Sequence, residues 1–279
     1  MQRDSKILGR MPYIHLRRGR YKYLAQPPFT KFLGPWIAPY SGKQANRPSY
    51  EKQVIGALLF DLPDFDEAGF ELHYDFQDWQ PFYWHGFSQT SYYTYVLDDL
   101  SDLDGVFRAF RSEKRKDIAK AERQLTVGND FSPGDLHEHH RRTLAKQGKM
   151  ISYDREILER MFAAAESRDG GRIWCARDQA GQVHAGIFVV WDDRSAYYLI
   201  SSIDPDLRSS GAATQLIWEA IKYCSTRTKR FDFEGSMIEP VANSFRAFGA
   251  IPKPYSVLSR TDSKMLRLRK AVKMVLGHP

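Results

Sequence analysis

Hydrophobic and polar positions repeat with two different periods along this chain, so both helices and strands are expected. Apolar residues three and four positions apart predict helices, whereas alternation and short β-branched or aromatic runs predict strands. Helices are expected at 49–60, 102–124, 135–147, 154–167, 204–226, 240–248 and 265–276. Strands are expected at 70–74, 82–97, 173–177, 183–191, 196–202, 230–234 and 255–259. This mixed order, with three consecutive strands joined by short turns, indicates an α+β fold.

The pattern also predicts how the chain divides. Residues before 49 are punctuated by prolines and are expected to be rich in loops. The turn-rich stretch at 126–133 is the expected domain junction. It separates an N-terminal subdomain at 1–128 from a C-terminal subdomain at 129–260, and a basic amphipathic helix at 261–279 follows.

Composition narrows the class of protein. Of 279 residues, 42% are hydrophobic and 14% aromatic, which is ample for a packed core and excludes a disordered chain. The longest apolar run, 54–60, is far shorter than the ~20 residues that cross a bilayer, and no signal peptide is evident. Cys175 and Cys224 form no CxxC pair, which disfavours a disulfide scaffold or a cysteine zinc site. We expect a soluble, cytoplasmic protein of bacterial type.

Positive charge is concentrated in three clusters. The chain carries 41 Lys and Arg against 34 Asp and Glu, a formal charge of +7. The clusters lie at 1–23, 108–123 and 264–273. They are typical of proteins that bind a CoA, a nucleotide-sugar, a tRNA or an anionic membrane, or they are simply solvated faces. The tail helix, with Leu268, Val272 and Leu276 on one stripe, is expected to touch anionic lipid or to dock on the body.

A short glycine-containing segment between a predicted strand and a predicted helix is the first candidate site. Free backbone N–H groups at such a turn and the helix dipole can hold a pyrophosphate, and small residues allow close approach. The candidate ligand-binding residues are Ile203, Arg208, Ser209, Ser210, Gly211, Ala212 and Ala213. Backbone N–H groups near 201–203, at the end of the preceding strand, are expected to polarise a carbonyl group of the ligand. The alternative is a helix N-terminus with small packing residues.

The strand predicted at 230–234 carries the candidate catalytic carboxylates. Alternation places Asp232 and Glu234 on one face, ~7 Å apart, where they can hold an ammonium group or accept its proton. Glu234 is the first candidate base and Asp232 the second, unless both bind structural partners. Ser236 follows on an expected turn, where its hydroxyl binds substrate or caps the next helix.

Several motifs together resemble the FemAB-like branch of the GNAT N-acyltransferase superfamily. They are RxxGxA at 208–213, FDFEGSM at 231–237, SFRAFGA at 244–250, Pro254-Tyr255, WHGFSQT at 84–90 and the basic segment 111–120. The resemblance covers about 45–260 and implies two tandem GNAT-like subdomains with mainly antiparallel sheets. It also implies transfer of an acyl or aminoacyl group to an amine in the cleft between the halves, with RxxGxA as the acyl-CoA loop.

One position departs from that family's pattern. Many GNAT enzymes carry a tyrosine that protonates the leaving thiolate, and Phe245 stands at the matching position. Tyr198, Tyr255 or water would replace it, or the donor is not a thioester. The second option keeps aminoacyl-tRNA, the donor of the family's founding cell-wall enzymes, as an alternative to acyl-CoA. The same departure supports a third hypothesis, a non-catalytic ligand-binding module.

We therefore expect an N-acyltransferase that moves an acyl group from acetyl-CoA or another acyl-CoA to an amine of a sugar, amino acid or peptide. Candidate substrate-binding residues are Trp84, Lys146, Tyr198 and Tyr255. No metal is expected, because His137 and His140 lack a third ligand and HExxH spacing. The absence of GxxxxGK, GxGxxG and GxSxG disfavours ATPases, dehydrogenases and hydrolases. The sequence carries no signal for the oligomeric state.

Overall fold

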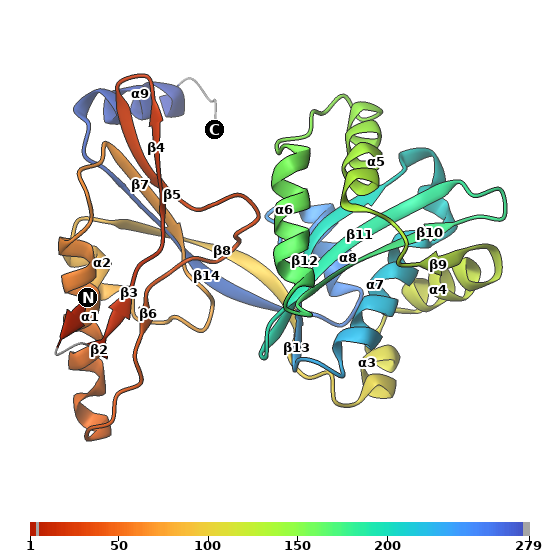
Figure 1. Cartoon of the computed structure of the whole chain (residues 1–279), viewed down its shortest axis with the longest axis horizontal. Helices are drawn as coiled ribbons and strands as arrows, with labels where there is room; N and C mark the ends of the chain where they lie inside the picture. The colour runs from red at the N-terminus through yellow and green to blue at the C-terminus, as the bar shows by residue number, and fades with distance from the viewer. Residues whose placement is uncertain (4–5, 276–279) are drawn as a thin grey trace. The chain divides into compact units, whose positions relative to one another are not determined.

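The computed structural model describes residues 1–3 and 6–275, and the side chains of residues 1 and 6–273 (Figure 1). The chain forms two compact units. Unit 1 comprises Met1–Tyr92 and the residues from Pro254 onward, and unit 2 comprises Tyr93–Lys253. None of the helices in the described part of the chain has the length and apolar character needed to cross a bilayer.

Unit 2 contains most of the strands of the ten-stranded sheet, and they run antiparallel except at one pair. Its strands follow the order β8 (Ser88–Leu97), β13 (Arg230–Asp232), β12 (Ser195–Ile203), β11 (Val183–Trp191), β10 (Gly171–Arg177) and β9 (Thr126–Gly128). Strands β12 and β13 run parallel. The three strands β10 to β12 lie where the hydrophobic pattern predicts them, whereas β9 lies in the stretch expected to be a domain junction.

Helices cover both faces of this sheet. They are α3 (Leu103–Ala109), α4 (Ser112–Gln124), α5 (Pro133–Ala145), α6 (Arg155–Glu166), η2 (Pro205–Ser210), α7 (Ala212–Cys224) and α8 (Glu239–Arg246). Alternate residues of β10 and β11 point to opposite faces. Trp174 and Ile187 belong to the core beneath α7, whereas Phe188 packs on Phe162 of α6. Figure 1 shows α5 and α6 on the face opposite α7.

Unit 1 has its own strands and its own core. Strands β4 (Ile14–Arg18), β5 (Tyr21–Ala25), β7 (Glu67–Glu71) and β14 (Ile251–Thr261) pair in that order, and the first residues of β14 belong to unit 2. Its helices are α1 (Arg47–Phe60), α2 (Gln80–Trp84) and α9 (Lys264–Val275), with η1 at Gln44–Asn46. Two small ribbons pair β1 (Gln2–Arg3) with β2 (Lys6–Ile7) and β3 (Gly9–Arg10) with β6 (Trp36–Ile37). Buried side chains including Leu24, Phe70 and Phe82 form the core.

Some predicted elements were wrong in extent. The helix expected at 102–124 is broken at Phe110, which is extended and buries its ring against Trp218 and Phe248. The next residue, Arg111, donates its N–H to the Ala247 carbonyl. The first residues of the strand expected at 82–97 are the end of helix α2, which Pro81 initiates. The helix expected to begin at Asp135 begins at Pro133, and Ser132 caps it by accepting the Asp135 N–H.

The proline-rich first fifty residues also contain more structure than expected, since β4 and β5 form a regular hairpin there. The compact units have other bounds than the subdomains 1–128 and 129–260 expected from the sequence. Residues Ile118 and Ala121 of α4 belong to the core of unit 2, which is why the segment before residue 128 lies with that unit. That each expected subdomain is a GNAT-like unit stays a prediction.

Candidate functional site

Strands β12 and β13 run together for only a short distance. Their register pairs Ser195 with Arg230, Ala196 with Phe231 and Tyr197 with Asp232, and the pairing ends there. Strand β12 continues to Ile203 while paired to β11 on its other side. Beyond Tyr197, the edge of β12 that faced β13 therefore has no strand partner among the described residues.

The direction of the backbone amides identifies which N–H groups line this edge. Alternate residues of an antiparallel strand direct their N–H and C=O groups to opposite sides. The Asp204 N–H, just after β12, donates to the His184 carbonyl of β11 at 3.0 Å. Ile203 and Ser201 lie one and three residues before Asp204, so their N–H groups point the other way, away from β11. That these amides bind a carbonyl oxygen stays a prediction.

Asp232, at the end of β13, is buried, and its hydrogen bonds hold neighbouring segments of the chain in place. Its side chain is fully inaccessible to solvent. One carboxylate oxygen, Oδ1, accepts from the Thr94 hydroxyl and from the Glu234 N–H, the latter at 2.7 Å. Asp232 therefore holds the turn after β13 and does not face solvent as a base would.

Glu234 sits on a strained turn just after β13 ends. Strand β13 ends at Asp232, and Glu234 has a positive φ of 58°, which L-residues rarely adopt. The prediction of two carboxylates on one strand face was therefore wrong. Gly235 continues the turn at φ 63°, and a Cβ there would lie 2.6 Å from the Thr94 Cα. Non-glycine residues with such rare backbone conformations are found preferentially at functional sites. Glu234 therefore remains the first candidate base.

Ser236 is not the cap of the next helix, because the N-cap residue of α8 is Ile238 and no side chain caps it. Its hydroxyl accepts the Ile238 N–H at 3.0 Å, just before α8 begins. This contact orders the start of the helix, in the manner of a Ser turn. It leaves a substrate-binding role for Ser236 as a prediction.

The glycine-containing segment expected to hold a pyrophosphate is covered by helix α4. Ser210, Gly211 and Ala212 are buried. Gly211 has φ 82°, and a Cβ there would lie 3.0 Å from the carbonyl carbon of Asp117 and nearer still to its oxygen. Gly211 lets α4 approach the N-terminus of α7, which is the role the sequence analysis gave as its alternative.

Two further contacts strengthen this cover. The Lys120 ammonium group donates to the Ser209 carbonyl at 2.7 Å, and the Asp117 carboxylate lies 3.5 Å from the Thr214 hydroxyl. The segment Pro205–Ser210 is itself a 3₁₀ helix, so part of its amides bond internally. Arg208 is exposed, and Ala213 is half-buried. The sequence contained a signal for this packing, since Ile118 and Ala121 give α4 an apolar stripe.

An aromatic cluster fills the space where a leaving-group acid was expected. The Phe245 ring packs on those of Tyr198, Phe233 and Tyr95. Burial raises the pKa of Tyr198 to about 12. The phenol of Tyr198 therefore keeps its proton at neutral pH and remains a potential donor.

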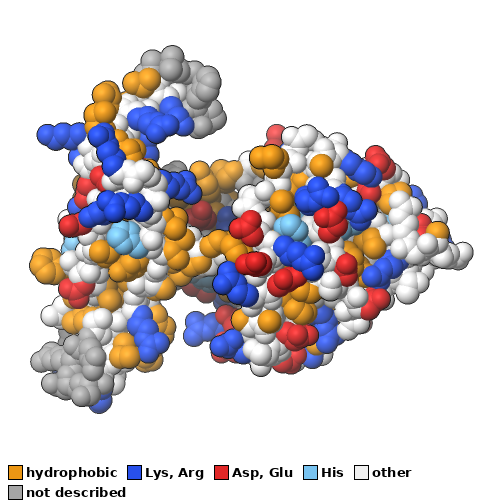
Figure 2. Space-filling view, turned by 45° about the horizontal axis from the view of Figure 1, so that its top comes forward, with side chains coloured by type: hydrophobic (Ala, Val, Ile, Leu, Met, Phe, Trp, Pro, Cys, Tyr) orange, Lys and Arg blue, Asp and Glu red, His pale blue; other side chains and the backbone are white. Residues whose placement is uncertain are grey.

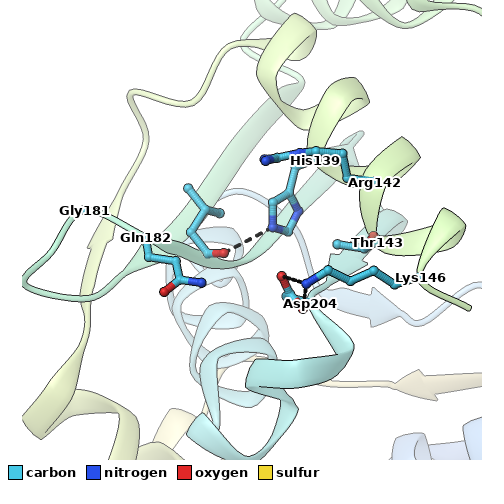
Figure 3. A pocket seen from close by; sticks show the side chains of 8 residues that line it. His139, Arg142, Thr143, Lys146, Gly181, Gln182 and Asp204 are labelled. Atoms are coloured by element: carbon cyan, nitrogen blue, oxygen red, sulfur yellow. Dashed lines mark hydrogen bonds and ion pairs between the residues drawn. The ribbon is translucent and has the colours of Figure 1, made fainter.

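Lys146 lies beside the end of β12, in a pocket of about 400 Å³ (Figure 3). Its ammonium group bonds to both carboxylate oxygens of Asp204 at 2.8 Å and to Asp206 at 2.7 Å. These hydrogen bonds, first to Asp204 and then to Asp206, raise the pKa of Lys146. His139 lines the same pocket, and burial lowers its pKa. Because Lys146 already holds two carboxylates, its role in binding an acceptor stays a prediction.

The other two predicted substrate residues belong to unit 1. Tyr255 is only 3% exposed and packs edge-on against Phe32 and Tyr92, so its ring serves the core. Trp84 is 62% exposed at the end of α2, with the Lys52 ammonium group 5.4 Å from its ring centroid. Trp84 therefore has a free ring surface, and Tyr255 does not.

Comparison with known protein families decides the identity of unit 2. The family model of the acetyltransferase (GNAT) domain matches residues 94–237, which is just over half of the chain. The chain belongs to the GNAT family. The matched part of this GNAT protein contains β12, β13, the turn with Glu234 and the segment covered by α4.

Solved structures show the same fold. FemX aligns with a TM-score of 0.64 at 12% identity, over 92% of this chain and 86% of FemX. A domain from Agrobacterium fabrum, the C-terminal part of a putative lysylphosphatidylglycerol synthetase, aligns with a TM-score of 0.56 at 14% identity, over 94% of this chain and 84% of that domain. A tandem GNAT protein from the clavulanic acid biosynthesis pathway aligns with a TM-score of 0.52 at 12% identity, over 94% of this chain and 81% of that protein. A search of curated proteins by sequence finds no match.

These likenesses confirm two predictions about the GNAT protein. Its fold is the predicted α+β GNAT fold, with a large, mostly antiparallel sheet flanked by helices. The resemblance to FemAB-like proteins is confirmed at the level of the fold by FemX and the tandem GNAT protein. Among the described residues, no three His, Cys, Asp or Glu side chains are grouped so that they could hold a metal ion.

Proposed function

We propose that this GNAT protein transfers an acyl or aminoacyl group from an activated ester to an amine. The observation that carries the proposal is the early separation of β12 from β13, which the strained turn with Glu234 follows in the chain. One of the amides on the open edge of β12, that of Ser201 or that of Ile203, would bind the donor carbonyl oxygen, where charge develops during attack. Glu234 would take the proton of the attacking amine.

The transfer balances with groups of this chain. The amine nitrogen forms the new C–N bond, and the bond between the carbonyl carbon and the leaving oxygen or sulfur breaks. The nitrogen proton passes to the Glu234 carboxylate. The leaving group takes a proton from water or from the Tyr198 phenol, whose raised pKa keeps it protonated.

Of the two donors expected from the sequence, the geometry favours aminoacyl-tRNA over acyl-CoA. An acyl-CoA would place its pyrophosphate at the N-terminus of α7, where Gly211 and Ala212 are buried under α4. The 3′ end of an aminoacyl-tRNA needs no pyrophosphate there. The exposed cations Arg208 and Lys116 lie on the two segments in contact and could bind backbone phosphates.

The donor is tested by binding to the full-length protein. We expect no saturable binding of acetyl-CoA in calorimetry, and binding of charged tRNA that weakens at least tenfold between 50 and 200 mM salt, because phosphate contacts release counterions. The double substitution Arg208→Ala and Lys116→Gln should weaken tRNA binding several-fold. Arg160→Gln is the matched control, since Arg160 is exposed on α6, on the opposite face of the sheet.

The reaction is tested with the Glu234→Gln variant and a panel of amino sugars, amino acids and peptides as acceptors. Loss of the base should reduce turnover by about 10²–10⁴ while donor affinity is kept. Saturable acetyl-CoA binding that Arg208→Ala weakens would instead establish the thioester donor. If neither donor binds, or if Glu234→Gln transfers at the original rate, the proposed mechanism is wrong.

A further inference from the structure

Helix α9 of unit 1 docks on the protein through one side only. Leu266 is 6% exposed, whereas Met265, Leu268 and Val272 are 57%, 61% and 48% exposed. At 3.6 residues per turn, these three exposed side chains fall within about 60° of one another, and Leu266 points about 130° away. An apolar stripe therefore runs along the outer side of α9, and no described residue covers it.

Polar contacts fix this orientation. The Lys270 ammonium group pairs with Glu67 at 2.9 Å and donates to the Thr261 hydroxyl. The Arg267 guanidinium group donates to the Asp262 carbonyl at 2.8 Å. Both residues lie on the docked side of α9, so the helix cannot rotate to bury its stripe without breaking these contacts.

Three further cations lie on α9. By helix geometry, Lys264 borders the stripe on one side and Arg269 on the other, and Lys273 lies further round, about 20° from the direction of Leu266. All three are exposed and form no ion pair with any described residue. An apolar stripe bordered by unpaired cations is the arrangement of helices that lie in the interface of anionic membranes.

A second basic element lies at the same end of unit 1. Strand β5 pairs with β7 at Tyr23 and Glu67, and Glu67 is the residue that holds Lys270 of α9. The β4–β5 hairpin carries the exposed Arg17, Arg18 and Arg20 around its turn. Figure 2 shows Lys and Arg side chains beside hydrophobic ones at the upper left, over α9 and this hairpin.

We propose that the outer side of α9, with Met265, Leu268 and Val272 in the lipid and the flanking cations on the headgroups, binds the surface of an anionic bilayer. A nucleic acid would use the cations but leave the aliphatic stripe in water. A helix of this length, Lys264–Val275, lies on a bilayer and cannot span it. The proposal concerns a different surface and unit from the transfer site and does not depend on the function proposed above.

The test uses the full-length protein and sedimentation with vesicles of phosphatidylcholine alone or with 30% phosphatidylglycerol. We expect binding only to the anionic vesicles. The triple variant Met265→Gln, Leu268→Gln, Val272→Gln should bind at least tenfold less, because the stripe supplies the apolar contact. Phe60→Gln is the matched control, since Phe60 is 84% exposed on α1 of the same unit and its loss should leave binding unchanged.

A charge variant separates the contribution of the cations. Lys264→Gln, Arg269→Gln and Lys273→Gln together should reduce anionic-vesicle binding at least tenfold and flatten its salt dependence. Equal melting temperatures of the variants exclude unfolding as the cause. The proposal is overturned if the protein ignores both vesicle types, or if the stripe variant binds as well as the original chain. It is also overturned if the stripe variant converts a dimer to a monomer in light scattering without vesicles, which would assign the stripe to a second copy.

Discussion

The backbone carbonyl of Asp117 on helix α4 takes the space that a Cβ of Gly211 would need, with the carbonyl carbon 3.0 Å from that position, so that α4 covers the N-terminus of α7. A glycine in an RxxGxA segment before a helix is expected to admit a ligand phosphate. Here the missing Cβ admits another helix of the same chain. This relationship is the reason that the proposed donor differs from the one that the motif alone predicts.

Substituting Gly211 tests this packing. Gly211→Ala should lower the free energy of unfolding by about 3 kcal/mol, from the cost of a left-handed alanine and the clash with Asp117. Gly181→Ala is the matched control, because Gly181 has a similar φ of 80° but open space around it. It should cost only about 1 kcal/mol. Urea unfolding of both variants gives the difference, and equal losses would contradict a tight contact with α4.

Replacing Glu234 by glycine, which relaxes the strained turn, should affect stability and activity differently. Glu234→Gly removes the cost of a positive φ in a non-glycine residue, about 1 kcal/mol, which offsets the greater flexibility of glycine in the unfolded chain. We expect the backbone change by itself to favour the folded variant, and the variant to lose acyl transfer. Unfolding curves and transfer assays measured on Glu234→Gly and Glu234→Gln check this. A large loss of stability in the glycine variant would show that the Glu234 side chain holds the turn.

Asp232 should act through the position of Glu234. Asp232→Ala leaves the Thr94 hydroxyl and the Glu234 N–H without their acceptor in a buried place, which should cost about 3 kcal/mol. Thr94→Val should cost about 1 kcal/mol, and the double variant less than the sum, because the two side chains share one hydrogen bond. Asp232→Asn keeps an acceptor oxygen and should restore part of the stability and of the turnover. Strict additivity in the double-mutant cycle would refute the coupling.

Acid should weaken unit 2 through a buried histidine. The His140 ring nitrogen Nδ1 lies 2.7 Å from the Tyr153 hydroxyl, and burial lowers the pKa of His140 to about 4. Above pH 6.5 the histidine is neutral in both states, so it does not favour unfolding. Between pH 6.5 and 4 the unfolded chain binds a proton that the folded chain does not, and stability falls.

The expected loss between pH 7 and pH 5 is about 1 kcal/mol, because part of the loss comes only below pH 5 and because His140 is only partly buried. Unfolding free energies in urea at pH 7 and pH 5 measure it. In His140→Gln the difference between the two pH values should shrink by a corresponding amount. An unchanged difference in the variant would assign the acid sensitivity to other groups.

Much of the architecture was predictable because its signals are local. Strands β10, β11 and β12 are short apolar runs separated by turn residues, and α6 has a clear apolar stripe, so their positions follow from periodicity. The break at Phe110 was not predictable, because it depends on the Trp218 and Phe248 rings, which are distant in sequence. The hairpin of β4 and β5 was missed because proline-rich flanks dominate the composition there.

The sequence by itself determined the α+β order, the resemblance to FemAB-like GNAT proteins and the candidate role of Glu234, since motif residues and hydrophobic periods are local properties. The tertiary structure decided what those residues do. It buried Asp232 beneath the turn, placed Glu234 in a left-handed conformation, and brought α4 onto Gly211. It also decided which side of α9 docks and which stays exposed. Such outcomes depend on contacts between segments far apart in the chain, and no local pattern contains them.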